Sequence, residues 1–129
     1  MDVVGDKWTL LVIRDAMDGA RSFTELQRRT GIARNILTDR LRKLVASGIL
    51  TRQAAPSGKR QEYLLTDAGH DLFPVIVGLR QWGERHAFLP HEDHSVLLDS
   101  DGRSLARLLP TTVDGAPASD TTTTVHKVT

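Results

Sequence analysis

The chain has 129 residues and a formal net charge of +1, with 17 Lys and Arg side chains against 16 Asp and Glu side chains. The absence of cysteine excludes a disulfide scaffold, a thiolate zinc site and a thiol-based sensor. No apolar run approaches the ~20 residues that span a bilayer, and the first residues lack the basic start and apolar stretch of a signal peptide. We therefore expect a cytoplasmic protein that does not enter a membrane.

The near-neutral total hides an uneven distribution of charge along the chain. Residues 1–60 carry a net charge of +6, whereas residues 61–129 carry a net charge of −5. Within residues 21–60 there are 10 basic side chains and 2 acidic ones. A basic first half of this kind favours a nucleic acid or another anionic surface as the partner.

The sequence predicts two helices before residue 31. Residues 6–17 are so rich in apolar side chains that we expect a helix buried on more than one side, ended by Gly19. Ser22 and Glu25 fit a capping box, because a hydroxyl and a carboxylate three residues later can satisfy free backbone donors. The short helix that they begin should end at Thr30.

A third helix is predicted from Ala33 to Ser47, followed by Gly48 in the position that commonly ends a helix. Leucines at helical spacing form its apolar stripe. The opposite face is polar and net positive, and it carries Asn35, Thr38, Asp39, Arg42 and Lys43.

After Gly48 the spacing of apolar residues changes to that of β-strands. Residues 49–52 and 62–65 are expected to form two short strands joined across a turn that contains Pro and Gly. Lys59 and Arg60 place two adjacent cations beside the tip of this hairpin.

The next predicted element is a helix that Thr66 caps and that runs to about Phe88. Pro74 lies inside this span and should kink the helix, because proline removes a backbone donor and clashes with the preceding turn. The helix carries more apolar surface than one small domain needs.

From Pro90 the composition becomes more polar, and we expect residues 1–89 and 90–129 to form separate regions. The Asp-Gly pairs at 101–102 and 114–115 are typical of hairpin turns. Two interpretations of the extension remain open: three small strands at 96–98, 104–109 and 121–125, or a polar tail.

This order of elements predicts a mainly α-helical winged helix-turn-helix fold with a small β-hairpin wing. A helix that enters the DNA major groove needs an outer face able to bond base edges and phosphates, and a flanking hairpin can reach phosphates or the minor groove. Asp39 could orient Arg42 or Lys43, accept from a cytosine amino group, or form an ion pair along the helix. The candidate DNA contacts are Arg34, Asn35, Thr38, Asp39, Arg42 and Lys43 on the helix, with Lys59 and Arg60 on the wing.

The same residues resemble the HxlR-type winged-helix transcriptional regulators of bacteria, over about Asp2 to Leu89. The resemblance implies a homodimer that binds operator DNA near its own or a neighbouring gene. By this resemblance the recognition helix lies at Ala33–Ser47 and the wing at Gln53–Gln61. The first and fourth helices are expected to form the dimer surface. The motifs that carry it are Gly5-Asp6-Lys7-Trp8, Phe23-x-x-Leu26, Leu37-x-x-x-Leu41-x-x-Leu44 and Tyr63-x-Leu65-Thr66-x-x-Gly69.

The sequence departs from that family pattern in three places. Members usually carry a segment, often with cysteine, before the Gly-Asp-Lys-Trp motif, and here Met1–Val4 precedes it. Ala33 stands where serine is common, and it has no side chain that can cap the helix. Members that sense oxidants or electrophiles do so through cysteine, so a ligand of this chain would have to bind without a covalent bond.

Other functions have weaker support in the sequence. Trp8, Phe73, Trp82 and Phe88 could line a pocket for a small-molecule effector, although core or interface packing is the commoner role of such residues. The histidines at 86, 91 and 94 are more typical of a solvated linker than of a metal site, and we expect no cofactor. The sequence lacks the common catalytic motifs, which predicts that the protein is not an enzyme. Two alternatives to an operator-specific regulator are a small-molecule-binding protein with secondary DNA binding and a non-specific architectural DNA binder.

Overall fold

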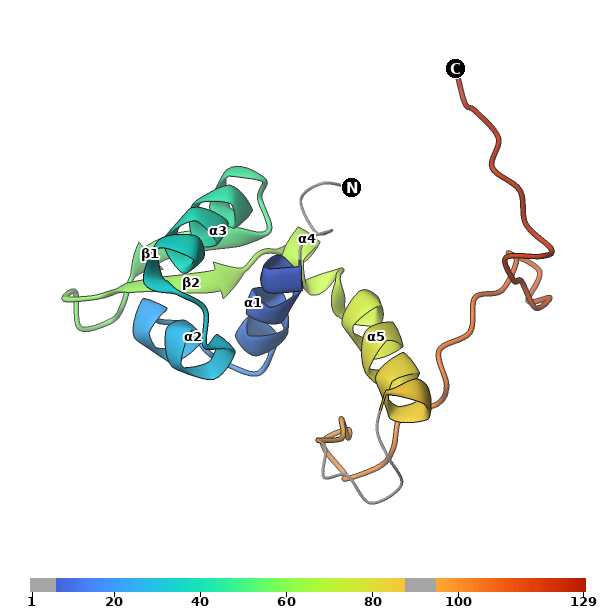
Figure 1. Ribbon diagram of the computed structural model, residues 1–129, viewed down its shortest axis with the longest axis horizontal. Coiled ribbons are helices and arrows are strands. Elements are labelled where there is room, and N and C mark those ends of the chain that lie inside the picture. Colours follow the sequence, from blue (N-terminus) through green and yellow to red (C-terminus); the bar gives the residue numbers. More distant parts are fainter. Residues whose placement is uncertain (1–6, 88–94) are drawn as a thin grey trace. The chain divides into compact units, whose positions relative to one another are not determined.

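The computed structural model of the protein describes residues 7–87 and 95–129 (Figure 1). By its internal contacts the chain divides into two units, Met1–Ile76 and Val77–Thr129. The first unit contains the helix-turn-helix and the hairpin. The second contains most of the last helix and the extension that follows it. The boundary at residue 89 that the sequence predicts stays a prediction.

Helices α1 (Lys7–Met17) and α2 (Phe23–Thr30) lie where the sequence predicts them. The side chain of Ser22 accepts a hydrogen bond from the Glu25 N–H at 3.1 Å, and its hydroxyl lies 3.1 Å from Glu25 Oε1. This arrangement confirms the predicted cap of α2. Two glycines with positive φ, Gly19 at 102° and Gly31 at 71°, end the two helices.

Helix α3 (Arg34–Ala46) packs its leucines into the core and turns its polar side outward. Leu37, Leu41 and Leu44 are each at most 1% exposed. Ala33 occupies the N-cap position without a side-chain hydrogen bond, as expected for alanine. At the other end Gly48 adopts a φ of 81°, which confirms that it ends the helix.

The wing is an antiparallel hairpin of β1 (Leu50–Ala54) and β2 (Gln61–Leu65). The pairs run from Leu50 opposite Leu65 to Ala54 opposite Gln61. The strands therefore reach further toward the turn than the sequence predicts. The Tyr63 N–H donates to the Arg21 carbonyl at 2.7 Å, which ties the hairpin to the segment before α2.

The single kinked helix predicted from Thr66 to Phe88 is wrong, because the described part of this span forms two helices. Helix α4 (Asp67–His70) ends after one turn, and α5 (Phe73–His86) begins three residues later. Pro74 is the second residue of α5, where its missing N–H would have had no helical partner. A new helix therefore begins at Phe73, with Pro74 in its first turn.

The core of the first unit is formed by side chains from α1, α2, α3, the start of the wing and the start of α5. Its buried residues are Val12, Ile13, Ala20, Leu26, Ile32, Leu37, Leu41, Leu44, Ile49, Leu50 and Ile76. These residues hold α3 by one side only, so the structure fixes which of its side chains face solvent.

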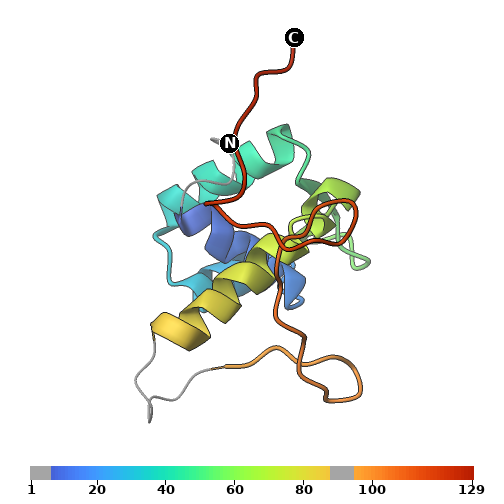
Figure 2. The same ribbon diagram turned by 90° about the vertical axis from the view of Figure 1, so that its right-hand side faces the viewer.

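Residues 95–129 follow an irregular course in the second unit (Figure 2). Isolated bridges pair Leu98 with Ser104 and Thr111 with Pro117, and each encloses one of the two Asp-Gly turns. The turns are thus confirmed, but three strands do not form in this part of the chain, and the polar tail is the nearer of the two interpretations. No helix in the described ranges is both long and apolar enough to cross a membrane.

Candidate nucleic-acid interface

The outer face of α3 presents most of the residues that the sequence selects as DNA contacts. Arg34, Asn35 and Thr38 are exposed, and the side chains of Arg42 and Lys43 are 74% and 67% exposed. The buried leucines on the other side of the helix keep this face outward. The result is a solvated surface of guanidinium, ammonium, amide and hydroxyl groups.

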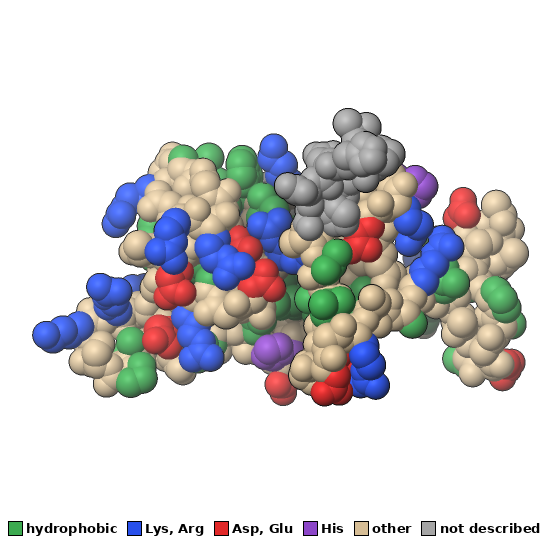
Figure 3. All heavy atoms as spheres, turned by 90° about the horizontal axis from the view of Figure 1, so that it is seen from below, with side chains coloured by type: hydrophobic (Ala, Val, Ile, Leu, Met, Phe, Trp, Pro, Cys, Tyr) green, Lys and Arg blue, Asp and Glu red, His purple; other side chains and the backbone are tan. Residues whose placement is uncertain are grey.

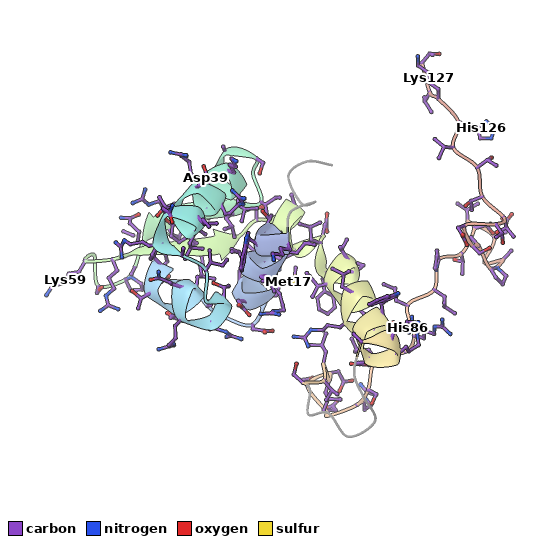
Figure 4. The ribbon with its side chains drawn as sticks, viewed as in Figure 1. Met17, Asp39, Lys59, His86, His126 and Lys127 are labelled. Carbon is purple, nitrogen blue, oxygen red and sulfur yellow. The ribbon has the colours of Figure 1, made fainter. Side chains whose placement is uncertain are left out.

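Asp39 lies at the centre of this face and binds three neighbouring cations (Figure 4). Its carboxylate lies 2.7 Å from Arg40 Nη1, 2.8 Å from Arg42 Nη2 and 3.1 Å from Lys43 Nζ. Hydrogen bonds from Lys43 and then Arg42 hold the pKa of Asp39 below its usual value. The ion pair along the helix that the sequence suggests for Asp39 is thus present. Its contact with a cytosine stays a prediction.

Two further contacts restrict side chains near the start of α3. The guanidinium of Arg34 lies 5.0 Å from the centre of the Phe23 ring, which joins α3 to α2 through a cation–π contact. The Thr38 hydroxyl donates to the Arg34 carbonyl at 2.9 Å. Because that donor is already used, Thr38 would meet a base or phosphate as an acceptor or through its methyl group.

The tip of the hairpin carries the two remaining candidates. Lys59 and Arg60 are exposed, and Figure 4 shows Lys59 at the end of the loop that projects from the two strands. Hydrogen bonds from the Ala55 N–H to the Arg60 carbonyl and from the Gly58 N–H to the Ala55 carbonyl, both 2.8 Å, shape this turn. In the space-filling view of Figure 3, Lys and Arg side chains project at the tip of the hairpin and lie over the part of the first unit beside it.

The sequence analysis did not select two cations that the structure adds to this surface. Arg52 is exposed on β1, opposite Tyr63 in the hairpin register. Arg40 contacts Asp39 and shows 23% of its side chain to solvent. The basic stretch at residues 21–60 includes Arg52 and was the signal for it in the sequence. Alternation along the strand would have placed Arg52 on the same face as Leu50.

One of the four residues suggested for a ligand pocket lines a cavity among the described residues. Phe73 lines a cavity of about 480 Å³ in the first unit, together with Met17, Arg21, Tyr63 and His70. Trp8 instead packs against the core, and Trp82 on α5 is 57% exposed. Phe88, like His91 and His94, lies outside the described residues.

The arrangement of α1–α3 and the hairpin is that of a winged helix-turn-helix protein. Comparison with known proteins extends this result, because the HxlR-like helix-turn-helix family model matches residues 3–91. The chain therefore belongs to the HxlR-like helix-turn-helix family.

Similar proteins agree with this membership. An uncharacterized HTH-type transcriptional regulator of Mycobacterium tuberculosis is 47% identical over 67% of this chain and 55% of its own length. The chain thus spans about half the length of that relative. A regulator described in the same words from Methanothermobacter thermautotrophicus is 35% identical over 71% of this chain and 70% of its own length.

Solved structures show the same fold. The crystal structure of PA1607, a proposed transcription factor, is 44% identical and covers 98% of this chain and 90% of its own, with a TM-score of 0.91. The redox regulator HypR in its reduced form is 34% identical and covers 67% of this chain and 87% of its own, with a TM-score of 0.60.

Proposed function

We propose that the protein is a homodimeric, sequence-specific DNA-binding regulator of transcription. In this role α3 enters the major groove, and the hairpin tip contacts the adjacent phosphates or minor groove. The protein acts in the cytoplasm, without catalysis and without a cofactor. Its binding to an operator represses a neighbouring gene or its own.

The observation that carries this proposal is the composition of the exposed face of α3. Arg34 and Arg42 can each donate two hydrogen bonds to guanine, and the amide of Asn35 can bond both N6 and N7 of adenine. Lys43 and the wing cations Lys59 and Arg60 supply charge for phosphates, which adds affinity that does not depend on sequence. A surface made only for non-specific binding would not need the amide and hydroxyl groups of Asn35 and Thr38.

Footprinting the protein on the DNA upstream of its own gene tests the proposal. We expect two protected half-sites whose centres lie about 34–36 Å apart, one helical turn of DNA, because a twofold dimer presents two copies of α3. Uniform protection along the whole fragment would instead support the architectural alternative. A steep salt dependence together with equal affinity for unrelated sequences would have the same meaning.

A second candidate function, response to a small-molecule effector, has support from the cavity beside Phe73. Its lining combines apolar groups of Met17 and Tyr63 with the polar side chains of Arg21 and His70 at an opening to solvent. Since the chain has no cysteine, an effector would bind by non-covalent contacts. Ligand binding would regulate DNA binding if it favoured one dimer geometry over another.

Quenching of tyrosine and tryptophan fluorescence by candidate ligands, with and without operator DNA, tests this second function. We expect a ligand of the cavity to bind less tightly when the operator is present, or to bind more tightly if it is a corepressor. A ligand whose affinity is identical in both conditions would not be an effector.

A further inference from the structure

The last residues of the chain form an extended segment, 109–129, which we call the arm. Every residue of the arm except Ala118 is exposed. Its valines are almost completely exposed to solvent, with exposed fractions of 103% for Val113, 101% for Val125 and 93% for Val128. Figure 1 shows the arm as an irregular trace that contains neither helix nor strand.

Local hydrogen bonds form two turns in the arm. The Thr112 N–H donates to the Ala116 carbonyl at 2.8 Å, and the Gly115 N–H donates to the Thr112 carbonyl at 2.9 Å. A second turn forms where the Ser119 N–H donates to Thr122 Oγ1 at 2.8 Å. Within the described ranges, the hydrogen bonds of the arm join one arm residue to another. Because fixing each residue costs conformational entropy, two such turns do not hold the whole segment in one course.

The course of the arm nevertheless has a counterpart in a related protein. The structure of PA1607 aligns with 98% of this chain at a TM-score of 0.91, so the alignment includes the arm. At 44% identity the two sequences differ at more than half of the aligned positions. A segment that had no contact outside its own turns would not keep one course through so many changes. We infer that the arm packs against a surface beyond its own turns.

The arm begins at a fixed point beside α5. The side-chain amide of Gln81 donates to the Ala106 carbonyl at 2.9 Å and accepts from the Leu108 N–H at 2.7 Å. It thus pairs with the chain on both sides of residue 107, as a neighbouring strand would. This double hydrogen bond holds the residues just before the arm against the helix.

Another side of α5 carries apolar side chains that are about half exposed to solvent. Val75, Leu79 and Trp82 are 44%, 51% and 57% exposed. Their spacing of four and three residues places them along one stripe of the helix, whereas Gln81 lies more than 90° away around the axis. The helix that fixes the start of the arm therefore also carries a surface suited to a second copy of itself.

We propose that the arm of each chain packs on a second copy of this chain. The inference rests on the homodimer of the proposed function and adds the arm to its interface. When two α5 helices pack through their stripes, their axes lie about 8–10 Å apart, a distance that the arm easily crosses. Twofold symmetry then exchanges both arms, and Val113, Val125 and Val128 are buried against the partner.

The charges of the arm favour a protein partner over DNA. The arm contains two aspartates, Asp114 and Asp120, and one lysine, Lys127. A slightly acidic segment does not attract a polyanion. Its valines and threonines instead suit the weakly polar surface of a protein subunit, where β-branched side chains pack well in extended conformations.

A spin label tests which chain the arm contacts. The cysteine-free sequence accepts a single label through Lys127→Cys. Labelled chains without ¹⁵N are mixed, and allowed to exchange subunits, with ¹⁵N-enriched chains without a label. We expect broadening of amide signals in the ¹⁵N-enriched copies. Broadening confined to samples with label and ¹⁵N in one chain would show that the arm folds back on its own chain, and would overturn the proposal.

A pair of substitutions tests the energetic role of the arm. Val125→Asp should weaken the dimer by about tenfold or more, because it buries an unpaired carboxylate at the interface. Thr129→Asp adds the same charge at the end of the arm and should change the dimer dissociation constant by less than about twofold. Equal dissociation constants for the two variants, measured by sedimentation, would contradict the proposal.

The outcomes also separate this inference from the proposed function. A wild-type chain that stays monomeric overturns both the arm contact and the homodimer. A dimer without broadening between chains overturns the arm contact alone. Operator binding by the wild-type protein is measured in the same samples, and its absence would bear on the DNA-binding role and not on the arm.

Discussion

At the scale of single residues, Asp39 is the feature that most affects how α3 can meet DNA. Its carboxylate holds Arg42 and Lys43 within 3.1 Å, so two cations that could bind phosphates are partly neutralised before any DNA arrives. Binding must release them or use them in their paired positions. An arrangement of this kind reduces affinity for every DNA sequence and favours those that offer further contacts to the arginines.

Asp39→Asn should therefore raise the affinity for unrelated DNA more than the affinity for the operator. We expect the ratio of the two affinities to fall several-fold, since the freed cations add phosphate contacts that do not depend on sequence. Asp99→Asn is a matched control, because Asp99 also holds an arginine, Arg103, at 2.7 Å but lies in the extension. Equal effects of the two substitutions in a fluorescence-anisotropy titration would contradict this role of Asp39.

The acidity of Asp39 gives a second prediction at this scale. Its pKa in the folded protein lies below the ordinary value of 3.8, first because of Lys43 and then because of Arg42. A lowered pKa means that the ion pairs contribute fully above the unfolded-state pKa and are lost as the pH falls through the folded one. Carboxyl chemical shifts measured during an acid titration should give a midpoint below 3.8 for Asp39. A midpoint above that value would show that the ion pairs do not form in solution.

At the scale of elements, the one-turn helix α4 explains why threonine and glycine stand three residues apart after the wing. The Thr66 hydroxyl donates to the Ile49 carbonyl at 3.1 Å and accepts from the Gly69 N–H at 3.1 Å, so it joins the end of β2 to the start of β1. Gly69 is buried, and a Cβ at that position would overlap the Ile49 carbonyl oxygen and the side chain of Leu65. The helix can approach the hairpin this closely only with glycine there.

Gly69→Ala should consequently lower the free energy of unfolding of the protein by about 1–3 kcal/mol, as overpacking does where backbone cannot move aside. Ala68→Ser, at the exposed neighbouring position, should change it by less than about 0.5 kcal/mol. Urea denaturation followed by circular dichroism measures both. A Gly69→Ala protein as stable as the wild type would mean that α4 sits further from the hairpin than the structure shows.

The sequence predicted those elements whose signals are local. The Ser22 cap, the glycines at 31 and 48 and the leucine stripe of α3 each depend on residues within a few positions, and all are present. The sequence does not reveal the break before α5, because a proline within an apolar helical stretch also predicts a kink inside one helix. A proline in the first turn of a new helix gives the same local pattern.

The candidate site was predictable to the same extent. Helical spacing was enough to place the polar residues of α3 on one face. Contacts between elements were not predictable in this way, and the cation–π contact of Arg34 in α3 with Phe23 in α2 is an example. Side-chain pairing of this kind depends on rotamers and on neighbours that are distant in sequence, which a single sequence does not specify.

At the scale of the whole molecule, the distribution of charge and of apolar surface assigns different roles to the two ends of the chain. Residues 21–60 carry 10 basic side chains and 2 acidic ones, and they include all the candidate DNA contacts. Residues 61–129 carry a net negative charge and include the exposed apolar stripe of α5. We expect long-range attraction to turn the basic residues toward DNA and leave α5 available for dimerisation.

The double substitution Leu79→Asp and Trp82→Asp should convert the protein to a monomer. Two carboxylates in an apolar interface would raise the dimer dissociation constant by about 100-fold or more. Glu84→Lys reverses the charge of an exposed residue on the side of α5 opposite the stripe and should leave a dimer. Sedimentation velocity distinguishes these states, and a dimeric double variant would show that the stripe of α5 is not the interface.

Recognition of DNA sequence by the exposed face of α3 is the property on which the proposed function rests. The most direct measurement is a titration of operator and unrelated duplexes, with the operator first defined by selection from random DNA. The wild type and two double variants, Arg42→Ala/Lys43→Ala and the control Arg85→Ala/Arg107→Ala, are compared at one salt concentration. Each double variant loses two exposed cations. We predict that the α3 variant loses its preference for the operator while remaining a dimer, and that the control keeps it. An α3 variant that binds the operator as tightly as the wild type does would show that this face of α3 does not recognise the operator.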